Sequence, residues 1–200
     1  MKIIGVYLAA GNSRRMGPGI HKLSLPLHNE PLGNAALKTA LSSNLSDIII
    51  VTNDASWVSQ SLRYENVHIL SCSHSSQGQS YSLRCGVKKA MHMKADGIVV
   101  LLADQPFIKT ELINELIDCY KQNEMVYYVA AKYRGIVRPP VLFAKKIFPY
   151  LQTLKGDQGA RTIFQESFVK GITISYEEAA FFYDVNSWSD YKKLVQCYGK

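Results

Sequence analysis

The sequence predicts an α/β fold of three layers, in which helices cover both faces of a mostly parallel, twisted, Rossmann-like sheet. Strand-like and helix-like segments alternate along almost the whole chain, which is typical of this class. The strand-like segment at 98–103 is apolar throughout, as strands covered on both faces are. The 200 residues contain no internal repeat, low-complexity tract or linker rich in proline and serine, so we expect a single domain over residues 1–200.

The first half of the chain is expected to supply strands and helices in turn. The strands are indicated by apolar runs, such as Ile48-Ile49-Ile50-Val51. The strands are expected at residues 3–10, 47–52, 67–71 and 98–103. Helices are indicated by apolar residues three and four apart, as at Leu83, Val87 and Ala90. They are expected at residues 33–43, 56–63 and 80–93.

The second half is less regular. A helix is expected to begin with Thr110 as its N-cap, because Glu111 suits the first turn and apolar residues follow at helical spacing. A turn at Arg134-Gly135 separates two predicted strands, and Ser187 is expected to cap a closing helix. The predicted elements are strands at 126–132, 137–143 and 172–176 and helices at 159–167 and 187–198.

The charge of the chain is positive but dispersed. The formal net charge is +7, and the lysines and arginines do not form a basic run. A dispersed positive charge suits a site that attracts polyanionic small molecules. It does not favour a nucleic-acid partner, which a clustered basic patch would indicate.

The four cysteines indicate no disulfide framework. Cys72, Cys85, Cys119 and Cys197 form no C-x-x-C pair and no regular spacing, so reduced thiols are expected. No stretch approaches the length of a membrane span. We therefore expect a cytoplasmic protein without a membrane partner.

A glycine-rich loop follows the first predicted strand. The run 6–17 reads V-Y-L-A-A-G-N-S-R-R-M-G, with Lys22 just beyond. Glycines let backbone N–H groups approach a ligand closely, and the cations beside them neutralise phosphate oxygens. The spacing fits neither G-x-x-x-x-G-K-[ST] nor G-x-G-x-x-G. The loop therefore predicts a nucleoside triphosphate site, against the alternative of an ordinary turn with solvated arginines.

An acidic residue ends the predicted strand at 98–103. Asp104 lies at the carboxyl end of a buried strand, where doubly wound sheets bind their ligands. A carboxylate there needs a nearby cation, and Mg²⁺ prefers one or two carboxylates together with substrate phosphates. The alternative is that Asp104 merely caps the helix near Thr110, although it lies too far upstream to do so well.

Several segments together resemble one family. They are L-A-A-G-N-S-R-R-M-G at 8–17, G-Q-S-Y-S-L at 78–83, L-A-D-Q-P at 102–106, P-P-V-L-F at 139–143, G-D-Q-G-A-R at 156–161 and D-V-N-S at 184–187. In order and spacing they are similar to the molybdenum cofactor cytidylyltransferases and other MobA-like NTP transferases, which include accessory proteins of xanthine dehydrogenase and purine catabolism. The resemblance runs from residue 4 to about residue 191.

The resemblance implies a fold of the nucleotide-diphospho-sugar transferase type and a Mg²⁺-dependent nucleotidyltransferase. The implied reaction transfers CMP from CTP to molybdopterin, with or without molybdenum, and releases pyrophosphate. It would serve the maturation of a molybdenum hydroxylase such as xanthine dehydrogenase. Residues 1–110 would hold the nucleotide, and residues 126–186 would hold the acceptor.

The expected catalytic residues are three. Arg15 is expected on the leaving phosphate oxygens, Lys22 on the α-phosphate, and Asp104 on Mg²⁺. The second metal ligand is expected to be Asn186 or Asp184. All of these groups would act by positioning and by neutralising charge.

Other residues are expected to contact the nucleotide or the acceptor. Ala10 carries the choice of base, because the family members that use CTP read L-A-A-G and those that use GTP read L-A-G-G. Ser80 and Ser82 are expected near the base or phosphate, or else as N-caps. The nucleotide contacts expected besides Lys22 are Leu8, Ala9, Ala10, Gly11, Asn53, Ser80 and Ser82. The expected acceptor contacts are Arg138, Asp157 and Arg161.

Two other functions remain open at this point. The same loop, lysine and aspartate would serve a sugar-phosphate or polyol-phosphate nucleotidyltransferase. The other alternative is a non-catalytic carrier of the molybdenum cofactor. A carrier, however, needs no carboxylate that holds a metal ion against a triphosphate.

Overall fold

The computed structural model describes residues 1–11, 13–17, 19–156 and 160–198, and it confirms the predicted fold class. A twisted sheet of seven strands has the order β5-β4-β1-β6-β8-β7-β9. Its strands are β1 (Ile3–Leu8), β4 (Asp47–Val51), β5 (Val67–Leu70), β6 (Gly97–Leu102), β7 (Tyr128–Tyr133), β8 (Ile136–Ala144) and β9 (Gly171–Ser175). All pairings are parallel except those of β8, which runs antiparallel to both β6 and β7.

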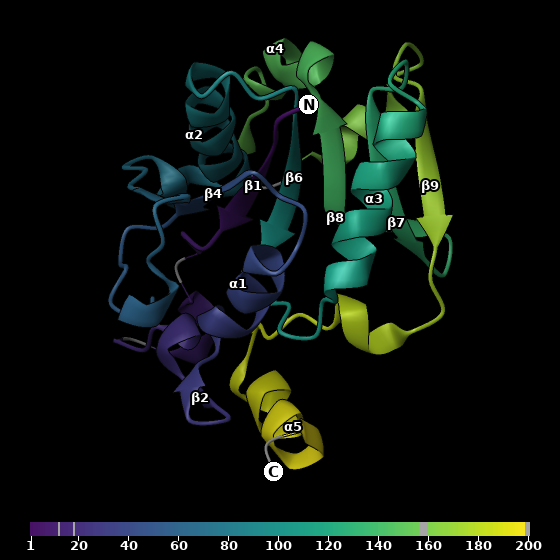
Figure 1. Cartoon of the computed structure of the whole chain (residues 1–200). Helices are drawn as coiled ribbons and strands as arrows, with labels where there is room; N and C mark the ends of the chain where they lie inside the picture. The colour runs from purple at the N-terminus through teal and green to yellow at the C-terminus, as the bar shows by residue number, and fades with distance from the viewer. Residues whose placement is uncertain (12, 18, 157–159, 199–200) are drawn as a thin grey trace.

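Helices pack on both faces of this sheet (Figure 1). They are α1 (Gly33–Leu41), α2 (Gln79–His92), α3 (Thr110–Gln122), α4 (Phe148–Leu151) and α5 (Trp188–Tyr198). Alternate residues of β1 enter two separate cores, because successive side chains of a strand point to opposite faces. Ile3 and Tyr7 join the core under α1 and α3, whereas Ile4 and Val6 join the core under α2.

Helix α2 lies unusually close to the sheet. A side chain at Gly86 would collide with Val6 on β1 and would crowd Val51 on β4. Glycine at this position therefore lets the helix backbone approach the centre of the sheet. The first residue of α2, Gln79, lines the same cavity as Leu8 at the end of β1, so this end of the helix lies at the edge that carries the predicted loop.

The order of the strands creates a switch point beside β1. The chain passes from β1 outward through β4 and β5, and then returns to β6 on the other side of β1. Leu8 pairs with Val51 on one side and with Leu102 on the other, so the three strands end at one edge. A crevice at such an edge is where open α/β sheets bind ligands.

The predicted turn at Arg134-Gly135 is confirmed. Both residues have positive φ angles, 47° and 79°, as the two central residues of a type I′ hairpin turn do. The turn joins β7 to β8, and the pairing of the two strands is interrupted by a bulge between Ala130 and Ala131. Pro139 and Pro140 lie opposite this irregularity, where the absence of their N–H groups costs no ladder hydrogen bond.

Three predicted helices differ from the structure in extent or capping. The prediction at 56–63 is wrong apart from a 3₁₀ turn at Gln60–Leu62, because Trp57 is drawn into the core against Tyr7 instead. The prediction at 159–167 becomes a 3₁₀ helix at Arg161–Gln165. Thr110 does not cap α3, because the helix begins at Thr110 and its hydroxyl donates to Thr39 O.

Some elements were not predicted. They are the hairpin β2 (Pro26–Leu27) and β3 (Glu30–Pro31), the short helix α4 and several 3₁₀ turns. The hairpin strands are two residues each, too short for a periodic pattern to show. In Figure 1 this hairpin lies beside α5 at the end of the molecule that carries the C-terminus, and Tyr191 Oη donates to Pro26 O at 2.7 Å.

The closing helix α5 is capped as predicted. Asp190 N donates to Ser187 Oγ at 3.3 Å, and Ser187 N donates to Asp190 Oδ2 at 2.8 Å, so the two residues form a capping box. Trp188 then donates its indole N–H to Met16 O at 2.8 Å. Helix α5 is thereby tied to the glycine-rich loop, 172 residues away in sequence.

The expectation that all the thiols are reduced is wrong. Cys72, just after β5, forms a disulfide with Cys85 on α2, whereas Cys119 and Cys197 are free. The fold brings the two residues together because the end of β5 lies beside the second turn of α2, which sequence spacing does not reveal. No helix among the described residues combines the length and the apolar character that crossing a membrane requires.

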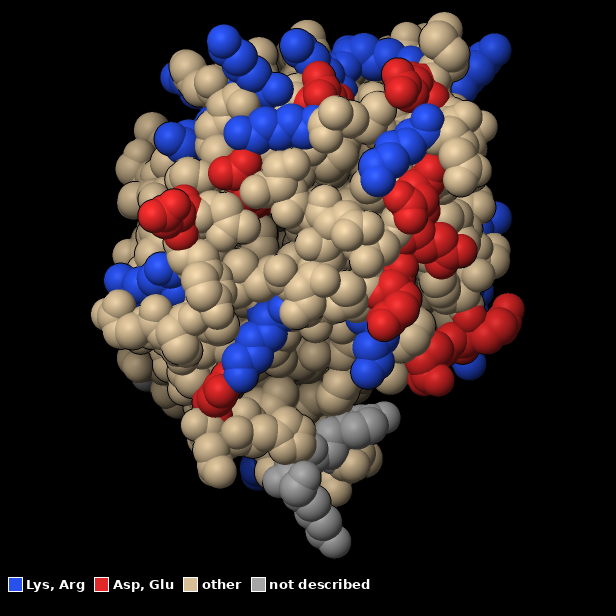
Figure 2. All heavy atoms as spheres, in the orientation of Figure 1, with Lys and Arg blue, Asp and Glu red and all other residues tan. Residues whose placement is uncertain are grey.

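Charged side chains of both signs lie on the face that Figure 2 shows, and each sign is denser in one region. Acidic side chains gather over α3, whose exposed residues include Glu111, Glu115 and Asp118. Basic side chains gather along the edge near α4. The positive charge of the chain therefore does not form one continuous patch over this face.

Candidate functional site

Three adjoining cavities lie along the edge where β1, β4 and β6 end. We call them the outer, charged and apolar cavities, with volumes of about 630, 360 and 100 Å³. The outer cavity is lined by Ala9, Ala10, Gly11, Ser13, Gly17, Gly19, Ile20, His21, Asn53 and Asp54. It shares Ala10, Gly11 and Ser13 with the charged cavity. Leu8 and Gln79 line both the charged and the apolar cavities, so the three form a continuous path.

Lys22 and Asp104 meet in the charged cavity. The Lys22 ammonium forms an ion pair with Asp104 Oδ2, and the two side chains are only 12% and 17% exposed. Lys22 comes from a 3₁₀ turn after the glycine-rich loop, and Asp104 comes from the residues that follow β6. The structure therefore brings the predicted cation and the predicted metal carboxylate into direct contact, although they are 82 residues apart in sequence.

Arg15 and Asn186 lie on the same cavity. Arg15 Nη2 donates to Asn186 Oδ1 at 3.0 Å, and both residues line the charged cavity with Lys22 and Asp104. Asp184, the other predicted metal ligand, lines the apolar cavity instead. Of the two predicted ligands, only the amide oxygen of Asn186 thus shares a cavity with Asp104.

Asp184 lies in an environment that disfavours its charged form. Burial raises the pKa of the Asp184 carboxyl above its ordinary value, and the nearby Asp104 carboxylate raises it further. A hydrogen bond from Gln105 Nε2 to Asp184 Oδ1, at 2.8 Å, acts in the opposite direction. Arg138 and Lys22 also lower this pKa. The charge of Asp104 therefore affects the protonation of Asp184 in the neighbouring cavity.

The donor set of the charged cavity fits a hard divalent cation. Asp104 supplies a carboxylate and Asn186 an amide oxygen, which are the ligand types that Mg²⁺ prefers. No group of three or more His, Cys, Asp or Glu side chains suited to a metal occurs among the described residues. A cation here would therefore complete its coordination with phosphate oxygens and water, as Mg²⁺ in nucleotide enzymes does.

The glycine-rich loop wraps around the outer and charged cavities. Ser13 has a left-handed φ of 46°, and Gly17 and Gly19 have φ angles of 98° and 75°. Ser13 Oγ accepts a hydrogen bond from Lys22 N at 3.2 Å, which ties the two ends of the loop together. Ala9 lines the outer cavity, so all four predicted contacts between residues 8 and 11 border at least one cavity.

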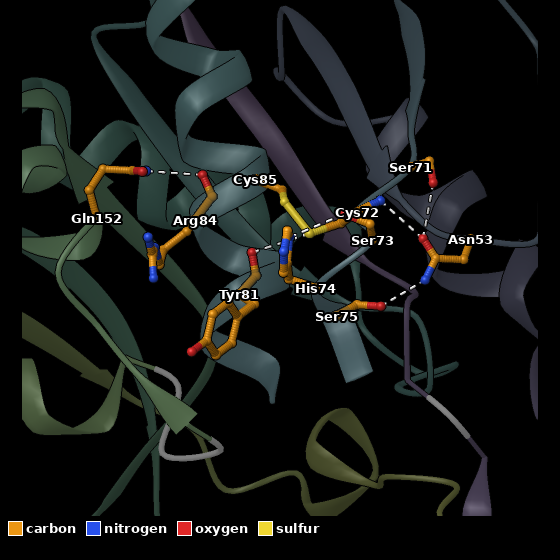
Figure 3. The surroundings of a disulfide bond; sticks show 10 residues. All are labelled: Asn53, Ser71, Cys72, Ser73, His74, Ser75, Tyr81, Arg84, Cys85 and Gln152. Atoms are coloured by element: carbon orange, nitrogen blue, oxygen red, sulfur yellow. Dashed lines mark hydrogen bonds between the residues drawn. A yellow bond between two sulfur atoms is a disulfide. The ribbon is translucent and has the colours of Figure 1, made fainter. Parts of the chain in front are cut away.

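Asn53 lies in the outer cavity with its amide already engaged. Asn53 Oδ1 accepts from Cys72 N at 3.0 Å, and Asn53 Nδ2 donates to Ser75 Oγ at 2.7 Å (Figure 3). Asn53 thus joins the end of β4 to the segment that follows the Cys72–Cys85 disulfide. Ser75 in turn lines the charged cavity, so the disulfide region forms one wall of the site.

Ser80 and Ser82 take different positions. Ser82 lines the charged cavity. Ser80 is fully buried and its hydroxyl donates to Gly156 O at 2.7 Å, so its placement does not support a nucleotide contact. The alternative of N-capping is wrong for both, because Gly78 occupies the N-cap of α2 and no side chain caps the helix.

The predicted acceptor residues flank the apolar cavity. Arg138 and Arg161 line it together with Asp184, while Asp157 lies outside the described residues. Sequence reasoning missed Gln105, which also lines this cavity and is 1% exposed. Its position directly after Asp104 was the only available signal, and such adjacency does not show where a side chain points.

Comparison with known proteins places this geometry in a family. Residues 5–171 match the MobA-like NTP transferase domain. The chain is 40% identical over 173 residues to the purine catabolism protein PucB of Bacillus subtilis (strain 168), covering 82% of this chain and 80% of that protein. It is 25% identical over 115 residues to the 2-C-methyl-D-erythritol 4-phosphate cytidylyltransferase of Thermotoga neapolitana, covering 57% and 52% of the two chains.

Solved structures share the fold. Rv0371c from Mycobacterium tuberculosis H37Rv superposes with a TM-score of 0.81 over 98% of both chains, at 24% identity. At this identity the likeness shows the fold alone. It agrees with the predicted sheet of the nucleotide-diphospho-sugar transferase type.

Proposed function

This chain belongs to the MobA-like NTP transferase family and is a nucleotidyltransferase, and on that premise we propose that it transfers CMP from CTP to molybdopterin, with or without molybdenum. The reaction releases pyrophosphate and depends on Mg²⁺. Its product would serve a molybdenum hydroxylase such as xanthine dehydrogenase. The 40% identical relative carries the name of a purine catabolism protein, which supports this pathway.

The pairing of Lys22 with Asp104 is the observation that supports catalysis. It places a cation and a carboxylate together at the switch point of the sheet, in a cavity that also holds Arg15 and Asn186. A protein that only carried a cofactor would need neither a largely buried cation nor a largely buried carboxylate at this edge. In the nucleotide-free protein each charge neutralises the other, which avoids leaving either one unpaired.

The proposed reaction is one displacement at phosphorus. A phosphate oxygen of the acceptor forms a bond to the α-phosphorus of CTP, and the bond from that phosphorus to the bridging oxygen of the β-phosphate breaks. Lys22 holds the α-phosphate and Arg15 holds the leaving pyrophosphate, so both neutralise charge that would otherwise oppose the reaction. Asp104 and Asn186 would hold Mg²⁺, which supplies further charge neutralisation on the phosphates.

Ala10 supports cytosine as the base. It is 9% exposed and lines both the outer and the charged cavities, at the boundary between the proposed base and phosphate positions. Its methyl group leaves less room than glycine would for a purine. A single methyl group contributes only about 1–3 kcal/mol of discrimination, so other residues of the outer cavity must add to the preference.

The test is pyrophosphate release from CTP, GTP, ATP and UTP, each with Mg²⁺ and either molybdopterin or 2-C-methyl-D-erythritol 4-phosphate as acceptor. We expect turnover with CTP and molybdopterin, a product whose mass equals molybdopterin plus CMP, and loss of turnover when EDTA removes the metal. Addition of Mg²⁺ should restore it.

The alternatives give different results in the same assay. Turnover with the polyol phosphate but not with molybdopterin would identify a polyol-phosphate nucleotidyltransferase. Binding of molybdopterin without pyrophosphate release from any nucleotide would identify a carrier.

A further inference from the structure

Gln105 lines the apolar cavity and carries a hydrogen-bond acceptor that no described residue satisfies. The side chain is 1% exposed, and its Nε2 donates to Asp184 Oδ1 at 2.8 Å. Because a carboxylate oxygen accepts this bond, the amide orientation is set and Oε1 faces the other way. Oε1 is buried and has no partner among the described residues. A buried polar atom without a partner is unfavourable unless a ligand satisfies it.

Arg138 supplies an unused donor at the same cavity. Its Nε is buried and has no hydrogen-bond partner in the described part of the chain. Arg138 lies on β8 and lines the apolar cavity together with Gln105 and Asp184. The cavity therefore offers a ligand one acceptor and one donor that the protein itself leaves unsatisfied.

Apart from Gln79 and Arg161, the remaining walls of this cavity are apolar and partly aromatic. They include Leu83, Val100, Leu102, Val141, Phe143 and Phe164. The rings of Phe143 and Phe164 are nearly parallel, at 15°, with centroids 6.2 Å apart. Such walls favour a flat ring, whereas a polyol would place many of its hydroxyl groups against apolar side chains.

We propose that Gln105 and Arg138 recognise the edge of a heteroaromatic ring in the acceptor, with Gln105 Oε1 accepting from an exocyclic amino group and Arg138 Nε donating to a ring carbonyl. This inference rests on the proposed function, since a pterin carries an amino group and a carbonyl group on the same edge of its ring. Gln105 is thus a specificity residue for the acceptor. It is joined by one peptide bond to Asp104, so ring recognition and the phosphate site share one short segment.

A pair of small probes tests the contact without the reaction. We would titrate wild type, Gln105→Leu and Arg138→Leu with 6-hydroxymethylpterin and with 6-hydroxymethyllumazine, in which a carbonyl replaces the ring amino group. Wild type should bind the pterin at least ~10-fold more tightly than the lumazine, which is the order of discrimination that one satisfied polar contact gives. Gln105→Leu should reduce that ratio to about 3-fold or less. Arg138→Leu should weaken both probes together.

Controls separate recognition from folding. Gln152→Leu changes a glutamine that donates to Arg84 O away from the cavity, and it should keep the wild-type ratio. All variants should keep the wild-type affinity for CTP. Equal binding of the two probes by wild type, no pterin binding up to its solubility limit, or an unchanged ratio in Gln105→Leu would each overturn the inference.

The same measurements distinguish this inference from the proposed function. If CTP and molybdopterin react normally while wild type binds the pterin and the lumazine with equal affinity, only the proposed role of Gln105 and Arg138 is wrong. If the wild-type protein releases no pyrophosphate from CTP with molybdopterin, the proposed function is wrong whatever the probes show.

Discussion

At the scale of single residues, the site depends on a cation and a carboxylate that hold each other in place. Lys22 and Asp104 are both largely removed from solvent, so each needs the other when no nucleotide is bound. The proposed substrate would replace this arrangement: its phosphate oxygens would pair with Lys22, and Asp104 would be available to hold Mg²⁺. The pair therefore serves both the stability of the free protein and the proposed chemistry.

Removing either charge should abolish most of the activity. Asp104→Asn and Lys22→Met are each expected to lower kcat by about 10²–10³-fold, as the loss of one group that stabilises transition-state charge does. Steady-state pyrophosphate release measures this. Lys38→Met is the matched control, because Lys38 forms an ion pair with Glu30 at the exposed surface. A kcat within a few-fold of wild type in Asp104→Asn would contradict the proposed role of that carboxylate.

Asp184 should make the stability of the metal-free protein depend on pH. Its pKa is raised mainly by burial, so the folded protein holds the proton more tightly than the unfolded chain does. The stabilisation that follows is present below the ordinary Asp pKa and is lost as the pH rises through the raised value. At neutral pH the ionised carboxylate is therefore unfavourable.

Asp184→Asn should remove this cost while keeping an oxygen that accepts from Gln105. We expect the Tm to rise by roughly 2–4 °C at pH 7, which corresponds to about 1 kcal/mol in a chain of this size. The gain should vanish near pH 4. Thermal unfolding from pH 4 to 8 measures it, with Asp118→Asn on the exposed face of α3 as control. A gain of equal size at all pH values would rule out the titration of Asp184 as its cause.

At the scale of elements, the disulfide fastens a wall of the site to a helix. Cys72 precedes the segment that carries Ser75, and Cys85 lies on α2, which packs against β1 and β4 through Gly86. Asn53 adds three hydrogen bonds from the end of β4 to this region, through Ser71, Cys72 and Ser75. The wall of the charged cavity is thus held by one covalent and several polar links (Figure 3).

Loss of this disulfide should lower both stability and nucleotide affinity. The cysteines are 13 residues apart, and closing a loop of about that length contributes about 3 kcal/mol. We expect the double variant Cys72→Ala, Cys85→Ala to lose roughly 6–12 °C in Tm, and to bind CTP more weakly because the segment around Ser75 is released. Scanning calorimetry and CTP titration measure the two effects.

The free cysteines provide the control for that experiment. A double variant Cys119→Ala, Cys197→Ala should show no comparable loss, and a reductant should lower the Tm of wild type but not of the Cys72→Ala, Cys85→Ala variant. A Tm of wild type that is insensitive to a strong reductant would contradict a stabilising disulfide.

At the scale of the whole molecule, the proposed nucleotide site is assembled from distant parts of the chain. The loop after β1, the residues after β6 and the segment before α5 meet at one edge of the sheet, and Trp188 of α5 donates to the loop at Met16 O. A ligand at this edge contacts groups that come together only in the folded chain. Its binding should therefore stabilise the fold as a whole.

CTP with Mg²⁺ should raise the Tm of the whole chain. At a concentration 100 times its Kd, a ligand stabilises the native state by about 2.7 kcal/mol. This corresponds to roughly 5–10 °C for this chain length. Differential scanning fluorimetry with CTP and GTP measures the shift, and the GTP shift should be smaller. If Asp104→Asn showed the same Mg²⁺-dependent shift as wild type, the metal would not be bound through this carboxylate.

The sequence by itself determined the class of the fold and the place of the site. Unbroken apolar runs indicate strands that are covered on both faces, and the carboxyl ends of parallel strands meet at one edge. Lys22 after the first strand and Asp104 after the strand at 98–103 could therefore be expected to converge. Ser187 was predictable as a cap because its partner Asp190 is only three residues away.

Only the tertiary structure decided how side chains beyond the strand ends are directed. It placed Asn186 with Asp104 and turned Asp184 to the neighbouring cavity, joined Cys72 to Cys85, and buried Gln105 with one end of its amide unsatisfied. Periodic patterns reflect burial within one element, because they arise from the geometry of that element alone. The direction of a side chain in a loop instead depends on which distant segments pack around it. A local sequence pattern does not predict those contacts.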